Sequence, residues 1–179
     1  MILHIDPHIR LELIAAHHAA PLFELIDSNR AYLRKWLTFV DYMSSLADVQ
    51  QFVLWSNTRY EAGTEFAFVI LSADTVIGRI GIYKIDSQHK VGEIGYWVAE
   101  NQQGKGIIAQ CCRAIVKFGF LTIDLNRLEI KCGTQNLKSK HIAEALHFTR
   151  EGIIRQGEYL NGKYVDLYLY SLLKKEYSS

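Results

Sequence analysis

The sequence contains little proline and cysteine, and it has neither a long apolar run nor a surplus of one charge. Only Pro7 and Pro21 occur, so no proline-rich linker divides the chain, and we expect one domain over residues 1–179. No run of about 18 apolar residues exists, which excludes a membrane-spanning helix. Twenty Lys and Arg face nineteen Asp and Glu, which argues against a strongly basic nucleic-acid-binding protein.

The three cysteines and seven histidines show no metal-binding spacing. Cys111 and Cys112 are adjacent, Cys132 stands alone, and the absence of a C-x-x-C pair excludes a zinc ribbon and a thiol redox motif. No histidine has the spacing of a ligand set or a catalytic triad, so no metal site is predicted. The N-terminal residues carry no pattern of a secretion or transit peptide. We therefore expect reduced thiols and a cytoplasmic protein.

The apolar residues indicate a mixed α/β fold of the α+β type. Helical spacing occurs in residues 17–28, 46–62, 106–121 and 137–146. Extended segments are expected at 2–5 and 9–14, and strands at 66–71, 76–85, 91–99, 128–133, 148–155 and 163–172. Asn161-Gly162 predicts a tight hairpin between the last two strands. An antiparallel meander thus precedes a strand–helix–strand–helix unit, with helices on the faces of the sheet.

The segment Gln103-Gly104-Lys105-Gly106-Ile107-Ile108 lies between a predicted strand and a predicted helix. Glycine permits positive φ, and the free N–H groups at a helix N-terminus form a site for anions. Lys105 adds a positive charge, and residues 102–163 contain ten Lys and Arg but only five Asp and Glu. These features favour a phosphate-bearing ligand.

Three interpretations of this glycine loop compete: a turn without a ligand, a dinucleotide fold, and the pyrophosphate loop of an enzyme that uses acetyl-coenzyme A. Gly104-x-Gly106-x-x-Ala109 satisfies the dinucleotide pattern, but the next strand ends near Cys132-Gly133-Thr134 without the required acid. An ATP-binding P-loop is excluded because no correctly spaced G-K-[ST] is present.

The loop resembles the Q/R-x-x-G-x-G/A motif of the GCN5-related N-acetyltransferase (GNAT) superfamily, with Gln103 first, Gly106 fourth and a departure at Ile108. Further segments are similar to its Rim-type branch, the ribosomal-protein-serine/alanine N-acetyltransferases. They are Tyr32-Leu33-Arg34-Lys35-Trp36-Leu37, Gly95-Tyr96-Trp97-Val98, Asn126-Arg127-Leu128-Glu129-Ile130, Asn136-x-x-Ser139, His147-Phe148-Thr149-x-Glu151-Gly152 and Glu158-Tyr159-Leu160-Asn161-Gly162-x-Tyr164-x-Asp166. The resemblance therefore covers nearly the whole chain.

The resemblance implies a single N-acetyltransferase domain with a mixed, mostly antiparallel sheet of about seven strands flanked by helices. It implies acetyl transfer from acetyl-coenzyme A to an α-amino group, such as the N-terminus of a ribosomal protein, by direct attack in a ternary complex. It also implies a homodimer. Neither a nucleic acid nor a membrane is expected as a direct partner.

The resemblance also assigns roles to individual residues. It implies Glu158 as the base, Ser139 as the acid that protonates the leaving thiolate, and Tyr32 and Trp36 along the acceptor groove. The cofactor-binding residues that it implies are Trp97, Val98, Gln103, Gly104, Lys105, Gly106, Ile107, Ile108, Asn136 and Ser139. An α-amine has a pKa of about 7.8, so only a modest base is needed.

Other interpretations stay open from the residues alone. Glu158 also fits a solvated carboxylate at a hairpin end, and Asn136 and Ser139 fit helix caps. Gly95 indicates a bulge, a close backbone approach or a packing glycine. The alternative functions are acetylation of a small amine (a polyamine, an amino acid or an aminoglycoside) and a non-catalytic coenzyme A sensor.

Overall fold

A computed structural model describes residues 1–177; residues 178–179 of the predicted domain lie outside the described part. The strands are β1 (Ile2–His4), β2 (Ile9–Leu13), β3 (Phe66–Ser72), β4 (Thr75–Asp86), β5 (Val91–Val98), β6 (Arg127–Gly133), β7 (Thr149–Leu160) and β8 (Lys163–Leu173). The α-helices are α1 (Ala19–Ser28), α2 (Arg30–Leu33), α3 (Leu46–Glu61), α4 (Ile107–Leu121) and α5 (Leu137–Ala145). Short 3-10 helices span Ala16–His18, Thr38–Tyr42, Glu100–Gln102 and Lys174–Glu176. No helix in residues 1–177 has the length and apolar character needed to cross a membrane.

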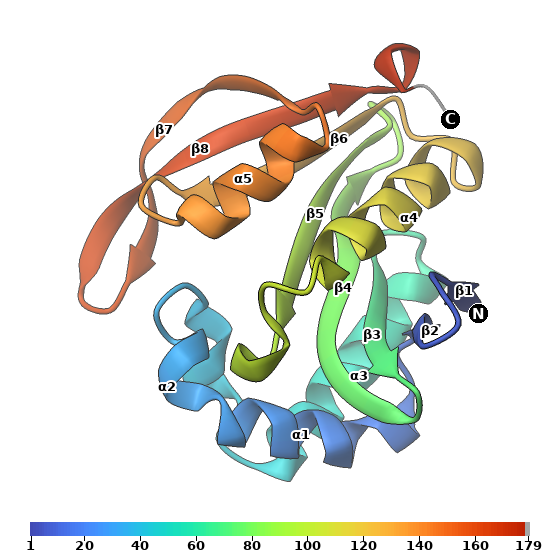
Figure 1. Cartoon of the computed structure of the whole chain (residues 1–179), viewed down its shortest axis with the longest axis vertical. Helices are drawn as coiled ribbons and strands as arrows, with labels where there is room; N and C mark the ends of the chain where they lie inside the picture. Colours follow the sequence, from blue (N-terminus) through green and yellow to red (C-terminus); the bar gives the residue numbers. More distant parts are fainter. Residues whose placement is uncertain (178–179) are drawn as a thin grey trace.

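The described strands form one eight-stranded sheet in the order β1-β2-β3-β4-β5-β6-β8-β7 (Figure 1). Every neighbouring pair is antiparallel except β5 and β6, which are parallel. The prediction of a mixed, mostly antiparallel sheet flanked by helices is confirmed. The sheet has eight strands rather than about seven, because the short β1 pairs along β2.

Helices cover both faces of the sheet and enclose two groups of buried side chains. One group joins α4 and α5 to the sheet, and the other joins α1 and α3 to the opposite face. Gly119 of α4 lies close to β4, since a β-carbon there would be 3.0 Å from Ile82 Cδ1. Cys111 and Cys112 of α4 and Cys132 of β6 are buried and free, as predicted.

The last hairpin differs from the prediction. Strand β7 continues to Leu160 rather than ending near residue 155, and it contains a bulge between Ile154 and Glu158. The backbone N–H of Gln156 donates to Asp166 Oδ1 at 2.7 Å, and Gln156 has a φ of +51°. This interrupted pairing hides the strand periodicity, because the extra residues break the alternation along the chain. After the bulge, Glu158 pairs with Val165 and lies near the end of the hairpin.

Candidate active site

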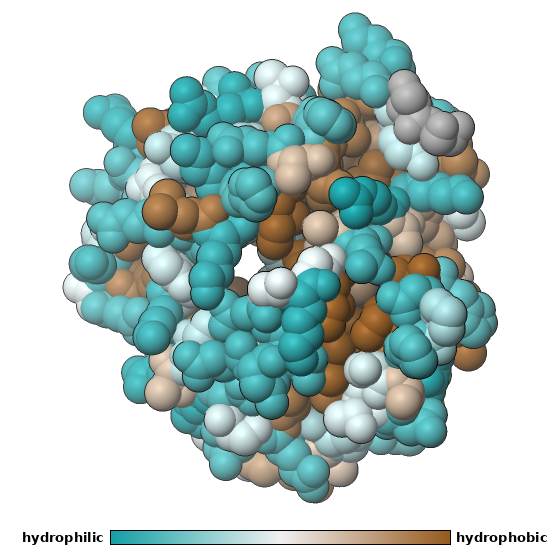
Figure 2. Space-filling model, in the orientation of Figure 1, coloured by the Kyte–Doolittle hydropathy of each residue, from teal (hydrophilic) through white to brown (hydrophobic). Residues whose placement is uncertain are grey.

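Strands β5 and β6 separate halfway along β5. They pair only at Val91–Arg127, Gly92–Leu128 and Glu93–Glu129. The rest of β5 stays paired with β4 on its other side, through Trp97–Arg79 and Val98–Gly78 among others. Figure 2 shows an opening through the molecule near the place where Figure 1 draws β5 and α5 apart. One edge of residues 94–98 is thereby left for pairing with an extended ligand.

The glycine loop stands at the end of this opening, directly before α4. Gly104 and Gly106 both have a φ of +73°, which other residues adopt only at a cost, and Gly106 is the N-cap of α4. No described residue accepts a hydrogen bond from the N–H of Lys105 or Gly106. The first N–H groups of α4 also lack partners inside the helix. Together these donors form a cradle that fits phosphate oxygens.

A second lysine, which the sequence pattern did not indicate, lies beside this loop. Lys105 Nζ donates to Gln102 Oε1 at 2.8 Å, whereas Lys138 Nζ donates to Gln103 Oε1. Lys138 is exposed in the first turn of α5, and only the packing of α5 brings it near a residue 35 positions earlier. Two ammonium groups therefore flank the cradle.

The start of α5 combines helix capping with a hydroxyl pair. Asn136 Oδ1 accepts from the N–H of Ser139 at 3.2 Å, so Asn136 caps α5. Ser139 Oγ lies 2.9 Å from the Oη of Tyr96, a β5 residue that sequence reasoning did not assign. Burial raises the pKa of Tyr96, which keeps its phenol protonated. Burial also raises the pKa of the Cys132 thiol, against the opposing hydrogen bond with Ser139. Two hydroxyl groups thus meet at the β5–β6 opening.

A cleft of about 680 Å³ lies on the face of the sheet that carries α3. Its lining residues are Leu37, Thr38, Phe39, Arg59, Thr64, Glu65, Arg79, Tyr83, Lys84, Glu93 and Glu158. The tip of the β7–β8 hairpin closes one end, since Asn161 Nδ2 donates to the carbonyl oxygen of Arg34 at 2.9 Å. This contact brings Glu158 to the segment that follows α2.

Glu158 and Glu93 both face this cleft, but their surroundings shift their pKa values in opposite directions. Burial and then the charge of Glu93 raise the pKa of Glu158 above its ordinary value, while Lys84 opposes the shift. Burial also opposes ionisation of Glu93. However, Lys131 at 2.9 Å and Lys84 at 3.2 Å outweigh that effect and lower its pKa. Within residues 1–177 no cation lies within 4 Å of the Glu158 carboxylate. Glu158 is therefore the carboxylate better suited to accept a proton.

The remaining predicted residues lie around the cleft. Trp97 is buried on the α3 face of β5, and Trp36 lies against Gly133 at the end of β6, where an added β-carbon would be 3.6 Å from its ring. Tyr32 lies near Glu100, whose charge adds to burial in raising the pKa of the phenol. The cleft lining includes neither Tyr32 nor Trp36 and takes Leu37, Thr38 and Phe39 from this segment instead.

Gly95 is not a bulge, because β4 and β5 pair without interruption at Gly81–Gly95. Its missing side chain makes room for Tyr83, whose ring would be 3.1 Å from a β-carbon on Gly95. The close approach is thus made by a side chain and not by the backbone.

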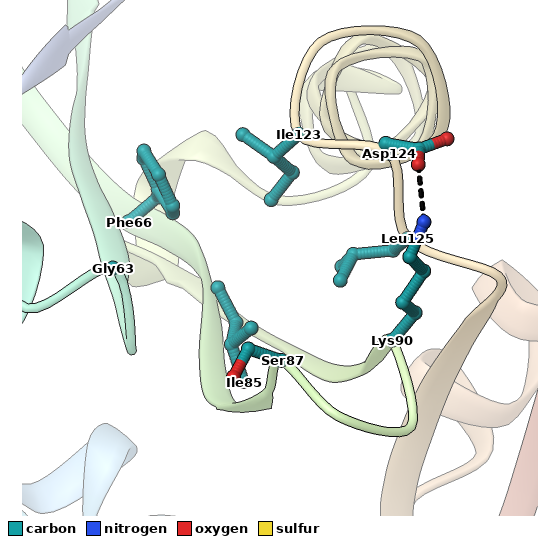
Figure 3. Close-up of a pocket in the computed structure, with 8 residues that line it drawn as sticks. All are labelled: Gly63, Phe66, Ile85, Ser87, Lys90, Ile123, Asp124 and Leu125. Carbon is teal, nitrogen blue, oxygen red and sulfur yellow. Dashed lines mark hydrogen bonds and ion pairs between the residues drawn. The ribbon is translucent and has the colours of Figure 1, made fainter.

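Two other groups of residues do not supply the chemistry of a site. The pocket in Figure 3, about 230 Å³, lies at the opposite end of β5, and Lys90 there pairs with Asp124 at 2.5 Å. Near the N-terminus, Glu12, His17 and His18 are close enough to hold a metal ion. However, His18 Nδ1 accepts from the N–H of Ala15 at 3.1 Å, so its Nε2 carries the proton and faces Glu12 at 3.3 Å.

Comparisons with known proteins agree with the geometry of the site. The family model described as "Acetyltransferase (GNAT) domain" matches residues 8–149. The chain is 35% identical to a putative ribosomal N-acetyltransferase of Bacillus subtilis, YdaF, over 97% of this chain and 95% of that protein. It is 32% identical to the ribosomal-protein-serine acetyltransferase of Escherichia coli, over 93% of each. A solved RimL ribosomal L7/L12 α-N-protein acetyltransferase in complex with coenzyme A has a TM-score of 0.95 and 28% identity, and the match covers 98% of this chain and 99% of that chain.

Proposed function

Because the chain belongs to the GNAT acetyltransferase family, we propose that it transfers the acetyl group of acetyl-coenzyme A to the α-amino group of a protein N-terminus, with ribosomal proteins as the acceptor class. The observation that carries this proposal is the unpaired Glu158 carboxylate in the cleft beside the β5–β6 opening. The names of the relatives and the coenzyme A of the solved RimL complex support it. Residues 1–179 would act as one N-acetyltransferase domain.

The residues of the opening fit acetyl-coenzyme A, which supplies an activated acetyl thioester. The N–H groups of residues 104–109 would hold its phosphates, and Lys105 and Lys138 would add positive charge. The free edge of β5, which includes Trp97 and Val98, would pair with its amide groups. Gln103 would position Lys138, and Asn136 would position Ser139.

The two proton transfers would involve residues on opposite sides of the opening. At pH 7 about 14% of an α-amine with a pKa near 7.8 is neutral, so a base of modest strength is enough. Glu158, directly or through water, would take the proton of the acceptor ammonium. A backbone N–H on the free edge of β5 would stabilise the oxyanion. Ser139, which Tyr96 contacts at 2.9 Å, would donate a proton to the leaving thiolate.

Incubation with acetyl-coenzyme A and a panel of acceptors tests the function. The panel contains peptides with free N-termini, the same peptides blocked at the N-terminus, polyamines, amino acids and an aminoglycoside. Mass spectrometry should find one added acetyl group on the free α-amines. Acetylation confined to polyamines would contradict the proposed acceptor, and coenzyme binding without transfer would support a sensor. The homodimer and the cytoplasmic location stay predictions, which gel filtration and cell fractionation address.

Replacing Ser139 with alanine should lower kcat by about tenfold, because an aligned proton donor to the thiolate is lost. Tyr96→Phe should have a smaller effect, since it removes only the group that orients the Ser139 hydroxyl at 2.9 Å. The measurement is kcat with both substrates saturating, together with the affinity for coenzyme A. An Asn136→Asp control keeps the cap of α5 and should retain folding. A kcat in Ser139→Ala equal to that of the wild type would contradict the assignment.

A further inference from the structure

Arg79 of β4 lines the same cleft as Glu158 and is held there by aromatic rings. Its guanidinium carbon lies 4.3 Å from the centre of the Phe52 ring, 5.5 Å from that of Tyr83 and 5.6 Å from that of Phe39. Contacts of this kind hold a guanidinium in place while leaving its N–H groups available for hydrogen bonds. Arg79 is thus a positioned cation in the wall of the cleft.

The other charges of the cleft are already paired. Arg59 lies 3.4 Å from Glu65, and Lys84 lies 3.2 Å from Glu93. In the described part of the chain no carboxylate oxygen lies within 4 Å of the Arg79 guanidinium. Among residues 1–177, Arg79 and Glu158 are therefore the two lining charges without an ion-pair partner, and they have opposite signs.

Trp97 of β5 is the cross-strand neighbour of Arg79. The two residues pair directly across β4 and β5, so their side chains lie on the same face of the sheet. The indole N–H of Trp97 is buried without a hydrogen-bond partner in residues 1–177. Phe39 lies near both groups, with its ring centre 6.1 Å from that of Trp97. The cleft lining does not include Trp97, so the site for a ligand in this cleft rests on Arg79.

We propose that the acceptor carries an anionic group, a carboxylate or a phosphate, close to its reactive amine, and that Arg79 binds this group while Glu158 receives the amine. The inference rests on the proposed function, because it uses the same cleft. It selects against polyamines, since a second ammonium in the cleft would meet the unpaired Arg79. It favours N-terminal peptides with an acidic residue near the amine.

The test compares peptides that differ in one charge. Peptides of the form Ser-X-Ala-Ala and Ser-Ala-X-Ala carry Glu, Gln, Lys or phosphoserine at X, and free glutamate and glutamine serve as small acceptors. The wild type should acetylate the Glu peptide with a kcat/KM about tenfold above that of its Gln twin, a ratio in the range of one charged hydrogen bond. The phosphoserine and free amino acid arms separate a phosphate from a side-chain or an α-carboxylate.

Variants of Arg79 link this preference to the cleft. Arg79→Gln should reduce the Glu-to-Gln ratio to about one, and Arg79→Lys, which keeps the charge, should retain part of it. Arg113→Gln removes an exposed arginine of α4 and should keep the full ratio. The affinity for coenzyme A checks that each variant is folded.

The outcomes distinguish the two proposals. A wild-type ratio near one, or a ratio that Arg79→Gln leaves unchanged, would overturn the anion site while leaving N-acetylation intact. Failure to acetylate any α-amine would overturn the proposed function. In that event, the affinity of the coenzyme A-bound protein for the Glu and Gln peptides, measured by calorimetry, still decides the anion site. Equal affinities would contradict it.

Discussion

Replacing Glu158 with glutamine should lower kcat by about 10²- to 10⁴-fold, the range for loss of a positioned general base. Glutamine has nearly the same shape but cannot accept the proton of the acceptor ammonium. The affinity for coenzyme A should change little, because Glu158 lies on β7 in the 680 Å³ cleft and not at the glycine loop. Steady-state kinetics with a peptide acceptor and calorimetry with coenzyme A measure the two effects.

The pH dependence of the reaction rate provides an independent test of Glu158 as the base. Because burial and Glu93 raise the pKa of Glu158, the wild-type rate should start to fall, as the pH decreases, at a higher pH than for an ordinary glutamate. The pH–rate profile of the glutamine variant should lose this acidic limb and show only the ionisation of the α-amine, at a pH of about 7.8. A residual profile that still shows the glutamate limb would assign the base to another group.

The free energy of unfolding of Glu158→Gln shows whether a lower rate comes from lost chemistry or from lost folding. A carboxyl group whose pKa is raised in the folded state binds protons more tightly there than in the unfolded chain. Its contribution is therefore favourable at low pH and is lost as the pH rises through the raised pKa. Glu158→Gln should thus unfold no more easily than the wild type at neutral pH. Glu61→Gln, at the exposed end of α3, is the matched control and should keep both activity and stability.

Gly106→Val should weaken the binding of acetyl-coenzyme A by about 10- to 100-fold, because the dihedral that aims the loop N–H groups is lost. Gly106 has a φ of +73° at the N-cap of α4, and a β-branched residue there moves the backbone out of this conformation. Losing one charge-assisted hydrogen bond costs about 1.5–3 kcal/mol, and each 1.4 kcal/mol or so is a factor of ten. Calorimetry with coenzyme A gives the dissociation constant.

Gly63→Val controls for the strain itself. Gly63 follows α3 and has a φ of +69°, and a β-carbon there would meet no atom of the described residues within 4 Å, while one on Gly106 would meet only Gln110 Nε2 at 4.0 Å. Both variants should lose a similar free energy of unfolding, of about 1–3 kcal/mol, but only Gly106→Val should lose coenzyme affinity. Equal affinity losses in the two variants would mean that strain, and not the loop, accounts for the effect.

The local patterns of the sequence correspond closely to the observed elements. Helix α4 follows the glycine loop because Gly104 and Gly106 favour the left-handed conformation and the apolar stripe after them has helical period. The Asn161-Gly162 turn closes the last hairpin, with both residues at positive φ. The sequence predicts too short a strand β7, because the bulge before Glu158 involves a hydrogen bond between Gln156 and Asp166, ten positions away.

The candidate site likewise contains residues that the sequence identifies and contacts that it does not. The residues that resemble known motifs, such as Gln103, Asn136 and Ser139, could be selected from the sequence, although their partners could not. Lys138 reaches Gln103 only because α5 packs beside the loop, and Tyr96 meets Ser139 only because β5 and β6 separate. These contacts join residues from 35 to 43 positions apart, so no local spacing contains them.

The sequence by itself determined the mixed fold, the glycine loop before α4 and the family, because backbone preferences and motif spacing act over a few neighbouring residues. Only the tertiary structure decided which charges of the cleft are free. Glu93 and Glu158 are both glutamates on strands, yet Lys84 and Lys131 pair with Glu93, whereas Glu158 has no cationic partner in residues 1–177. Arg79 is likewise distinguished from Arg59 only by its neighbours, three aromatic rings in place of a carboxylate. Charge pairing depends on distances across the sheet, which the order of residues does not contain.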